Sequence, residues 1–174
     1  MNSSRFSIEP ITPDAANIEA LASLLVETVA GGASVSFMHP LSMDRARAFW
    51  TDALAAAQRG ERVVLGAFAD ARLAGTVSLF TDMPENQQHR AEIGKLMTCG
   101  AFRNKGAATA LMHAAESRAA AAGRTLIVLD TAEMGGAAGL YEKLGYQRAG
   151  VIPDFASLPQ GGLCGTVIFW KRVA

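Results

Sequence analysis

The sequence predicts one mixed α/β domain, with a central, mostly antiparallel sheet of about seven strands flanked by about four helices. Strand-length and helix-length apolar patterns alternate along the 174 residues, and no repeat, low-complexity tract or linker interrupts them. A strand, a loop and a helix surround Gly106 near the middle of the chain, and open sheets usually bind ligands at such a point. We therefore expect a single domain over residues 1–174, with its functional site there.

The composition is that of a soluble globular protein, since 50% of the residues are apolar and 18% are charged. Lys and Arg number 16 and Asp and Glu number 16, which argues against a nucleic-acid surface. No run reaches the ~18 apolar residues of a membrane span, and the start lacks a secretory apolar region. Cys99 and Cys164 are typical of free thiols in a reducing compartment. We expect a cytoplasmic protein with no membrane partner and no metal.

The first part of the chain predicts a strand and two helices. Residues 5–11 have the apolar positions of a strand. Thr12 is expected to cap the next helix, with Pro13 at its first position and a Gly-Gly pair after its end. Ser42 is expected to cap a second helix, which Gly60 ends.

Residues 31–41 (GGASVSFMHPL), here named the elbow, join these helices. The elbow carries apolar side chains where a plain linker would be polar. It is either packed core or one wall of a small-molecule pocket, since such pockets are largely apolar with a few polar groups. As a pocket wall it would offer Ser34, Phe37 and His39 to a bound acceptor, although solvent exposure is an alternative for His39.

The middle of the chain predicts a hairpin and then the central unit. Residues 62–69 and 72–80 have the pattern of two strands joined by a tight turn. Residues 91–98 predict the next strand, followed by a short loop. An alanine-rich helix is expected to open at about Asn104 and to stop at Gly123.

The last part predicts three further strands and a short helix. The apolar run 125–130 is typical of a central strand covered on both faces. Residues 136–144 are expected to form a short helix, 147–152 a strand, 153–162 a loop and 163–172 the final strand.

Gly106, Ala107 and Ala108 lie where the strand turns into the alanine-rich helix. Small residues there leave backbone N–H groups uncovered at a helix N-terminus, and these donors together with the helix dipole favour phosphate oxygens. Arg103 and Lys105 add a local positive charge that suits one small polyanion. An ordinary junction with a glycine is the alternative interpretation.

Three motifs resemble the GNAT superfamily of N-acetyltransferases. RNKGAA at residues 103–108 is similar to its acetyl-CoA motif, LMT at 96–98 to the strand before it, and LYEKLGY at 140–146 to its second signature. The resemblance implies the GNAT fold and acetyl-CoA as co-substrate. GGASVSFM at 31–38 and LDT at 129–131, with RAEIGKLM at the central strand, look like the tabtoxin-resistance acetyltransferases, without fixing the natural acceptor.

The chain departs from the superfamily pattern at Gly100, where proline is common, and at Ala108, where glycine is common. Met134 replaces an asparagine that contacts pantetheine in many relatives, so that contact is not carried over. The resemblance implies that the strand backbone pairs with the pantetheine arm, and we assign the Thr98 N–H to the thioester carbonyl. The residues expected to bind the co-substrate are Leu96, Met97, Thr98, Arg103, Asn104, Lys105, Gly106, Ala107, Ala108, Thr109 and Tyr141.

Two carboxylates are candidates for the base that deprotonates the acceptor. Glu92 lies six residues before Thr98 in one predicted strand, and alternation places both side chains on one face. Asp130 ends an apolar strand and is expected to point into the adjoining cleft, or else to cap the next turn. The sequence does not decide between the two. The resemblance implies that Tyr141 protonates the departing thiolate; packing between helix and sheet is its structural alternative.

The sequence therefore predicts direct acetyl transfer from acetyl-CoA to an amine of a small molecule, for example an amino-acid-like or β-lactam toxin. The sequence also allows another antibiotic, a polyamine or a compound with a hydroxyl group as the acceptor. A covalent route through Cys99 lacks a histidine placed to activate it. A non-catalytic acyl-CoA-binding or toxin-sequestering protein is the alternative class, while a dinucleotide-binding fold lacks its three glycines after the first strand. The oligomeric state is unknown from the sequence.

Overall fold

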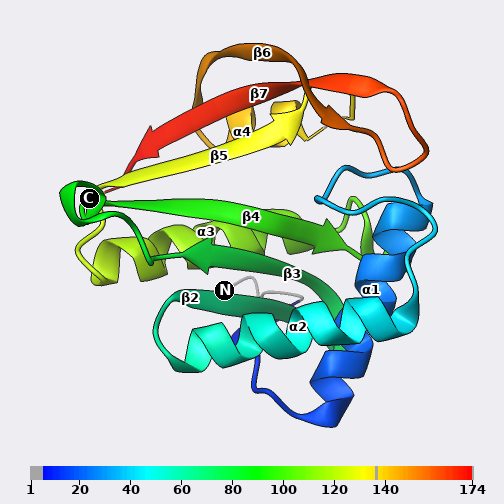
Figure 1. Ribbon diagram of the computed structural model, residues 1–174. Helices are drawn as coiled ribbons and strands as arrows, with labels where there is room; N and C mark the ends of the chain where they lie inside the picture. Colours follow the sequence, from blue (N-terminus) through cyan, green and yellow to red (C-terminus); the bar gives the residue numbers. More distant parts are fainter. Residues whose placement is uncertain (1–5, 136, 174) are drawn as a thin grey trace.

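The computed structural model describes residues 6–135 and 137–173, and it contains the predicted mixed sheet (Figure 1). Seven strands are arranged in the order β1-β2-β3-β4-β5-β7-β6. Only β4 and β5 pair in parallel, and the other neighbours are antiparallel. The strands are β1 Ser7–Pro10, β2 Arg62–Ala69, β3 Arg72–Phe80, β4 Arg90–Thr98, β5 Leu126–Ala132, β6 Gln147–Ser157 and β7 Leu163–Arg172.

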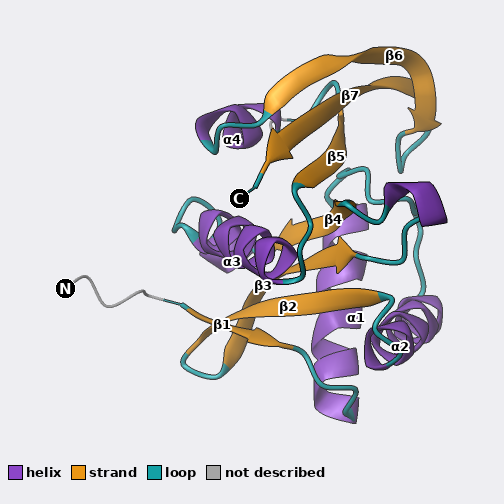
Figure 2. Ribbon diagram, turned by 90° about the vertical axis from the view of Figure 1, so that its left-hand side faces the viewer, coloured by secondary structure: helices purple, strands orange, loops and turns teal. Residues whose placement is uncertain are grey.

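Helices cover both faces of the sheet (Figure 2). The helices α1 and α2 share one core with Val64 and Met97, whereas α3 packs into a second core with Ile127 and Phe169. Between Phe6 and Val173, apart from residue 136, no helix is both long enough and apolar enough to span a membrane. The helices are α1 Ala15–Ala30, α2 Met43–Gln58, α3 Ala107–Ala121 and α4 Ala138–Lys143, with short 3-10 helices η1 Glu85–Gln87 and η2 Gly100–Phe102.

The predicted hairpin and the second helix are confirmed. β2 and β3 pair from Arg62↔Phe80 to Ala69↔Arg72, and the turn residues Asp70 and Ala71 both have a positive φ. Positive φ at both turn positions matches the right-handed twist of the flanking strands. Ser42 caps α2, because its side chain accepts a hydrogen bond from the N–H of Arg45 at 3.3 Å.

The prediction that Thr12 caps the first helix is wrong. Helix α1 begins at Ala15, and Asp14 is its cap, accepting a hydrogen bond from the Asn17 N–H at 2.9 Å. The Thr12 hydroxyl instead donates to the Asp14 carboxylate at 2.8 Å. The charged oxygen is the stronger acceptor for an orphan N–H, so the helix starts beyond Pro13 rather than at it.

Helix α3 begins at Ala107, three residues later than the sequence predicted. Asn104 and Gly106 have φ values of 58° and 91°, which a right-handed helix cannot include. Strand β6 extends to Ser157, through the proline at which a loop was expected. β6 pairs only with β7, and Pro153 falls at a shift of register, where a missing N–H is tolerated.

Strand β4 contains a β-bulge at Lys95. Thr76 of β3 faces Met97, whereas Ser78 faces Gly94, so β4 carries an extra residue there, and Lys95 has a φ of 54°. Before the bulge, Ile93 packs in the core beside α3; after it, Met97 packs in the core beside α1 and α2. A bulge reverses the alternation of side chains along the strand.

This reversal corrects the predicted placement of Glu92 and Thr98 on one face. Glu92 precedes Ile93 and so faces α1 and α2. Thr98 follows Met97 and so faces α3, beside Gly75, whose position borders Leu111 of that helix.

The pairing of β4 with β5 ends at Ile93 and Leu129. Beyond this point the two strands diverge, as the green and yellow arrows of Figure 1 show. Strand β5 continues to Ala132, so Asp130 lies inside the strand. The sequence had placed it at the end of the strand, which is wrong. The divergence leaves the backbone of residues 94–98 unpaired on the side that faces β5.

Candidate active site

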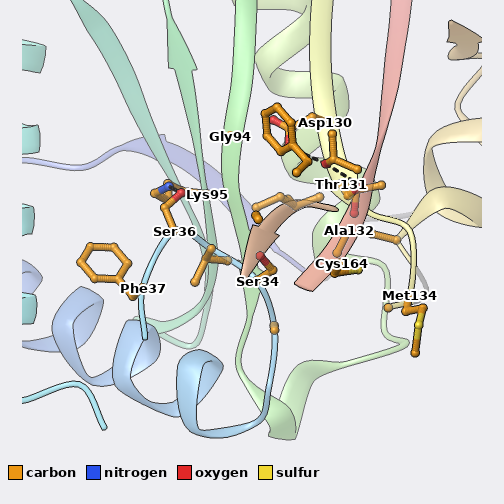
Figure 3. A pocket seen from close by; sticks show the side chains of 18 of the residues that line it. Ser34, Ser36, Phe37, Gly94, Lys95, Asp130, Thr131, Ala132, Met134 and Cys164 are labelled. Atoms are coloured by element: carbon orange, nitrogen blue, oxygen red, sulfur yellow. Dashed lines mark hydrogen bonds between the residues drawn. The ribbon is translucent and has the colours of Figure 1, made fainter. Parts of the chain in front are cut away.

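A pocket of about 450 Å³, here named the elbow pocket, opens where β4 and β5 diverge (Figure 3). The elbow forms one of its walls, which favours the pocket interpretation of this segment. Ser34 and Phe37 line it as predicted. His39 does not line it, because its side chain is exposed and its backbone N–H donates to the Pro159 carbonyl at 2.9 Å.

A second cavity of about 880 Å³, here named the loop groove, adjoins the elbow pocket, and Leu96 and Ala137 line both. Lys105 does not line the groove; its ammonium donates to the Ala101 carbonyl at 2.7 Å. The predicted co-substrate residues that do line the groove are Leu96, Met97, Thr98, Arg103, Asn104, Gly106, Ala107, Ala108 and Thr109.

The N-terminus of α3 opens into the loop groove. Gly106 is its N-cap, and within the described residues no side chain caps this end of the helix. The neighbouring η2 differs, because the Glu27 carboxylate accepts a hydrogen bond from the Gly100 N–H at 2.9 Å. Free backbone donors and the positive end of the α3 dipole therefore suit the phosphates of a nucleotide-like ligand.

Tyr141 of α4 lines the elbow pocket and is only 6% exposed. Its ring packs against Tyr146 and Phe169, with centroids 5.9 and 5.8 Å away. Burial, and then the nearby charge of Asp130, raise the pKa of Tyr141 to about 12. The phenol therefore stays protonated over the whole neutral pH range.

Asp130 of β5 lines the same pocket, and its Oδ2 accepts a hydrogen bond from the Thr166 hydroxyl at 3.1 Å. Figure 3 shows Asp130 on the β5 side of the pocket, away from Ser36 and Phe37 of the elbow. Because Asp130 lies within a strand, it does not cap the following turn. An exposed carboxylate that holds a single neutral hydrogen bond keeps acceptor capacity for a ligand.

Glu92 lies apart from these two residues. Its Oε1 accepts a hydrogen bond from the Arg90 guanidinium at 2.6 Å, and Arg90 also donates to Gln87 at 2.7 Å. Glu92 is absent from the described lining of both cavities. The sequence thus identified two carboxylates, of which the structure places Asp130 beside Tyr141.

Sequence reasoning missed Lys95, which also lines the elbow pocket. Its ammonium donates to the Ser36 hydroxyl at 2.9 Å and lies 5.9 Å from the centroid of the Phe49 ring. Burial lowers the pKa of Lys95, while the charge of Asp130 opposes this. The signal in the sequence was a lysine between Gly94 and Leu96 in an otherwise apolar strand.

The two cysteines are free thiols, as expected. Cys99 donates to the Leu73 carbonyl at 3.2 Å, and burial, followed by the Glu27 charge, raises the pKa of its thiol. A raised pKa disfavours the thiolate that a covalent route requires. Cys164 lines the elbow pocket and donates to the Gly165 carbonyl at 3.3 Å. No group of His, Cys, Asp or Glu side chains in the two described ranges is arranged to hold a metal ion.

The site thus combines an opening between two parallel strands with an uncapped helix N-terminus. Residues 27–146 match the model of the acetyltransferase (GNAT) family. The chain belongs to this family, and the predicted GNAT fold is confirmed.

Several solved structures share the fold over nearly the whole chain. An N-acetyltransferase from Staphylococcus aureus Mu50 has a TM-score of 0.82 and 16% identity, covering 98% of this chain and 100% of that one. The structure of yncA from Salmonella typhimurium with its cofactor acetyl-CoA has a TM-score of 0.80 and 16% identity, over 98% and 95%. A ribosomal-protein-alanine N-acetyltransferase from Brucella melitensis has a TM-score of 0.78 and 16% identity, over 95% and 99%. At this identity the likeness concerns the fold, and the tabtoxin-resistance subfamily stays a prediction.

Proposed function

We propose that this protein is an acetyl-CoA-dependent N-acetyltransferase, which moves an acetyl group directly from the thioester to an amine of a small molecule. The acceptor class that we favour is an amino-acid-like compound, which includes β-lactam toxins, so the activity would serve resistance. The observation that carries the proposal is the buried, protonated Tyr141 beside Asp130, in a pocket that adjoins the loop groove. We further propose that residues 1–174 act as one domain in the cytoplasm, without nucleic-acid or membrane partners.

The loop groove fits acetyl-CoA in two respects. Its lining includes the uncapped start of α3, whose N–H groups would bind the pyrophosphate, with Arg103 beside them. It also includes residues 96–98, whose backbone is free on the β5 side and would pair with the pantetheine amides. Lys105 is left out of this binding site, because its ammonium bonds to Ala101.

The reaction would follow from the positions of these groups. The neutral amine attacks the thioester carbonyl, and the N–H of Thr98 stabilises the negative oxygen of the tetrahedral intermediate. The C–S bond then breaks, Tyr141 gives its proton to the thiolate, and the phenolate takes the excess proton from the product nitrogen. The proton lost by the acceptor ammonium goes to Asp130, which we favour as base because it lines the pocket. Glu92, paired with Arg90, would act only through water.

A non-catalytic acyl-CoA-binding or toxin-sequestering protein is the alternative. Such a protein has no need of a buried phenol and a carboxylate in one pocket, and this pair favours catalysis.

Release of free thiol from acetyl-CoA, measured with and without candidate acceptors, tests the proposal. The acceptors should include the common amino acids, tabtoxinine-β-lactam, polyamines and hydroxyl compounds. Acceptor-dependent release of thiol with a matching acetylated product is the expected result. Tight binding of acetyl-CoA without any turnover would instead support the binding protein.

A further inference from the structure

The elbow pocket carries one charge of each sign. Among its described lining residues, Lys95 and Asp130 are the charged ones. They come from β4 and β5, the two strands that diverge, and Figure 3 shows them on separate walls of the pocket. The pocket as a whole therefore offers complementary sites for a cation and an anion on the same ligand.

The backbone and its neighbours hold Lys95 in this position. The β-bulge gives Lys95 a φ of 54° and directs its side chain toward the elbow, where Ser36 has a φ of 73°. Left-handed conformations are costly for both residue types, and such strain is common at binding sites. The Phe49 ring, which packs against the core of α1 and α2, lies beside the ammonium.

Lys95 forms no direct ion pair in the part of the chain that the structure describes. None of the ion pairs there includes it, and its one hydrogen bond goes to a neutral hydroxyl. An ammonium has further donors beyond the one that Ser36 accepts. The Asp130 carboxylate favours the Lys95 charge from across the pocket but forms no ion pair with it, so this partly buried ammonium keeps donors for an anion that a ligand supplies.

We infer that Lys95 binds the carboxylate of the acceptor, so that the substrate is a zwitterionic amino acid held between Lys95 and Asp130. Asp130 receives the amine and Lys95 the carboxylate, which directs the nitrogen rather than the acid group toward Tyr141. This inference rests on the proposed function. It disfavours polyamines, because their second ammonium would meet the Lys95 charge.

The experiment compares matched acceptors on the Lys95→Gln and wild-type proteins. The acceptors are the common L-amino acids, their amides and their decarboxylated amines, with thiol release from acetyl-CoA as the readout. We expect the wild type to prefer acids over amides, and Lys95→Gln to lose roughly 10- to 100-fold in kcat/KM for the acids, mainly through KM. Its kcat/KM for amides and amines should change less than about threefold.

Two further variants separate charge recognition from support of the elbow. Lys95→Arg should restore most of the preference for acids, because it keeps the cation. Arg45→Gln is the matched control: Arg45 lies over the Phe37 ring at 5.8 Å but outside the described pocket lining, so its loss should leave the acid-to-amide ratio unchanged.

The outcomes distinguish this inference from the proposed function. Equal losses for acids and amides in Lys95→Gln would refute carboxylate binding and leave Lys95 with a supporting role. A wild type that acetylates amines or amides in preference to acids would also refute the inference, while the proposed function stands. No acetyl transfer to any acceptor would overturn both.

Discussion

Replacing Tyr141 by phenylalanine removes one hydroxyl from the centre of the proposed site. With a pKa of about 12, roughly one phenol in 10⁵ is ionised at pH 7, so nearly every enzyme molecule has the proton to donate. The ring contacts with Tyr146 and Phe169, at 5.9 and 5.8 Å, remain in the variant. The fold should therefore persist while the proton source is lost.

We expect Tyr141→Phe to lower kcat by roughly 10- to 10⁴-fold, the usual contribution of general acid catalysis. The assay is steady-state release of thiol from acetyl-CoA at saturating acceptor, with the melting temperature as a test of folding. The dissociation constant for acetyl-CoA should change little, since the hydroxyl acts only when the thiolate leaves.

Tyr146→Phe provides the matched control, because Tyr146 belongs to the same aromatic cluster but not to the described lining of the elbow pocket. It should keep kcat within about threefold of the wild type. A Tyr141→Phe variant that also keeps its kcat would refute the assignment of Tyr141 as the acid. An equal loss in both variants would show that packing, not proton donation, sets the rate.

Four further predictions concern the base, the loop, pH and the thiol. Asp130→Asn should reduce kcat/KM by roughly 10²- to 10⁴-fold and Glu92→Gln by less, and the reverse order would assign the base to Glu92. The Cβ of Gly106→Ala would meet no atom within 4 Å, but the residue must keep a φ of 91°, which is strained for alanine. Calorimetry should therefore show that acetyl-CoA binding weakens by roughly tenfold. Unchanged binding would show that the left-handed turn is not needed to bind acetyl-CoA. The pKa of Tyr141 rises from near 10 to about 12 on folding, so between pH 10 and 12 the unfolded chain binds fewer protons than the folded one. The melting temperature should therefore fall as the pH rises from about 10. Tyr141→Phe should make this dependence of the melting temperature on pH less steep. Cys99→Ser should retain its turnover, because burial raises the pKa of the thiol, and inactive but folded protein would revive the covalent route.

Sequence periodicity predicted the elements whose local signals agree with their packing. The hairpin around Asp70 and Ala71 has two strand-length apolar segments and a tight turn, and all of this information is local. The turn at Gly106 was also predicted from its small neighbours near a helix start, whereas phosphate binding there stays a proposal. Tyr141 and Asp130 could be brought together only by resemblance, since residues from β5 and α4 meet through the tertiary fold.

Two of the errors, the placement of Glu92 and Thr98 on one face and the start of α3, share one cause, which is backbone geometry that composition does not encode. The bulge at Lys95 contains no glycine or proline at the bulged position, so simple alternation placed Glu92 and Thr98 on one face. Asn104 has a left-handed conformation, so α3 begins later in the chain than predicted. Because the bulge was not predicted, the sequence did not show which way the Lys95 side chain points. Its charge, which lies opposite Asp130, was therefore missed.

Pro153 has a consequence for solubility. β6 is an outer strand of the sheet, and it exposes Ile152 and Phe155, at 46% and 54%, on either side of Pro153 and the left-handed Asp154. An uninterrupted apolar edge would offer a template on which another chain could add a strand. Proline supplies no N–H at that point, and the shifted register bends the ladder away from a flat edge. Pro153, the residue because of which a loop was predicted here, thus also protects β6 from edge-to-edge aggregation.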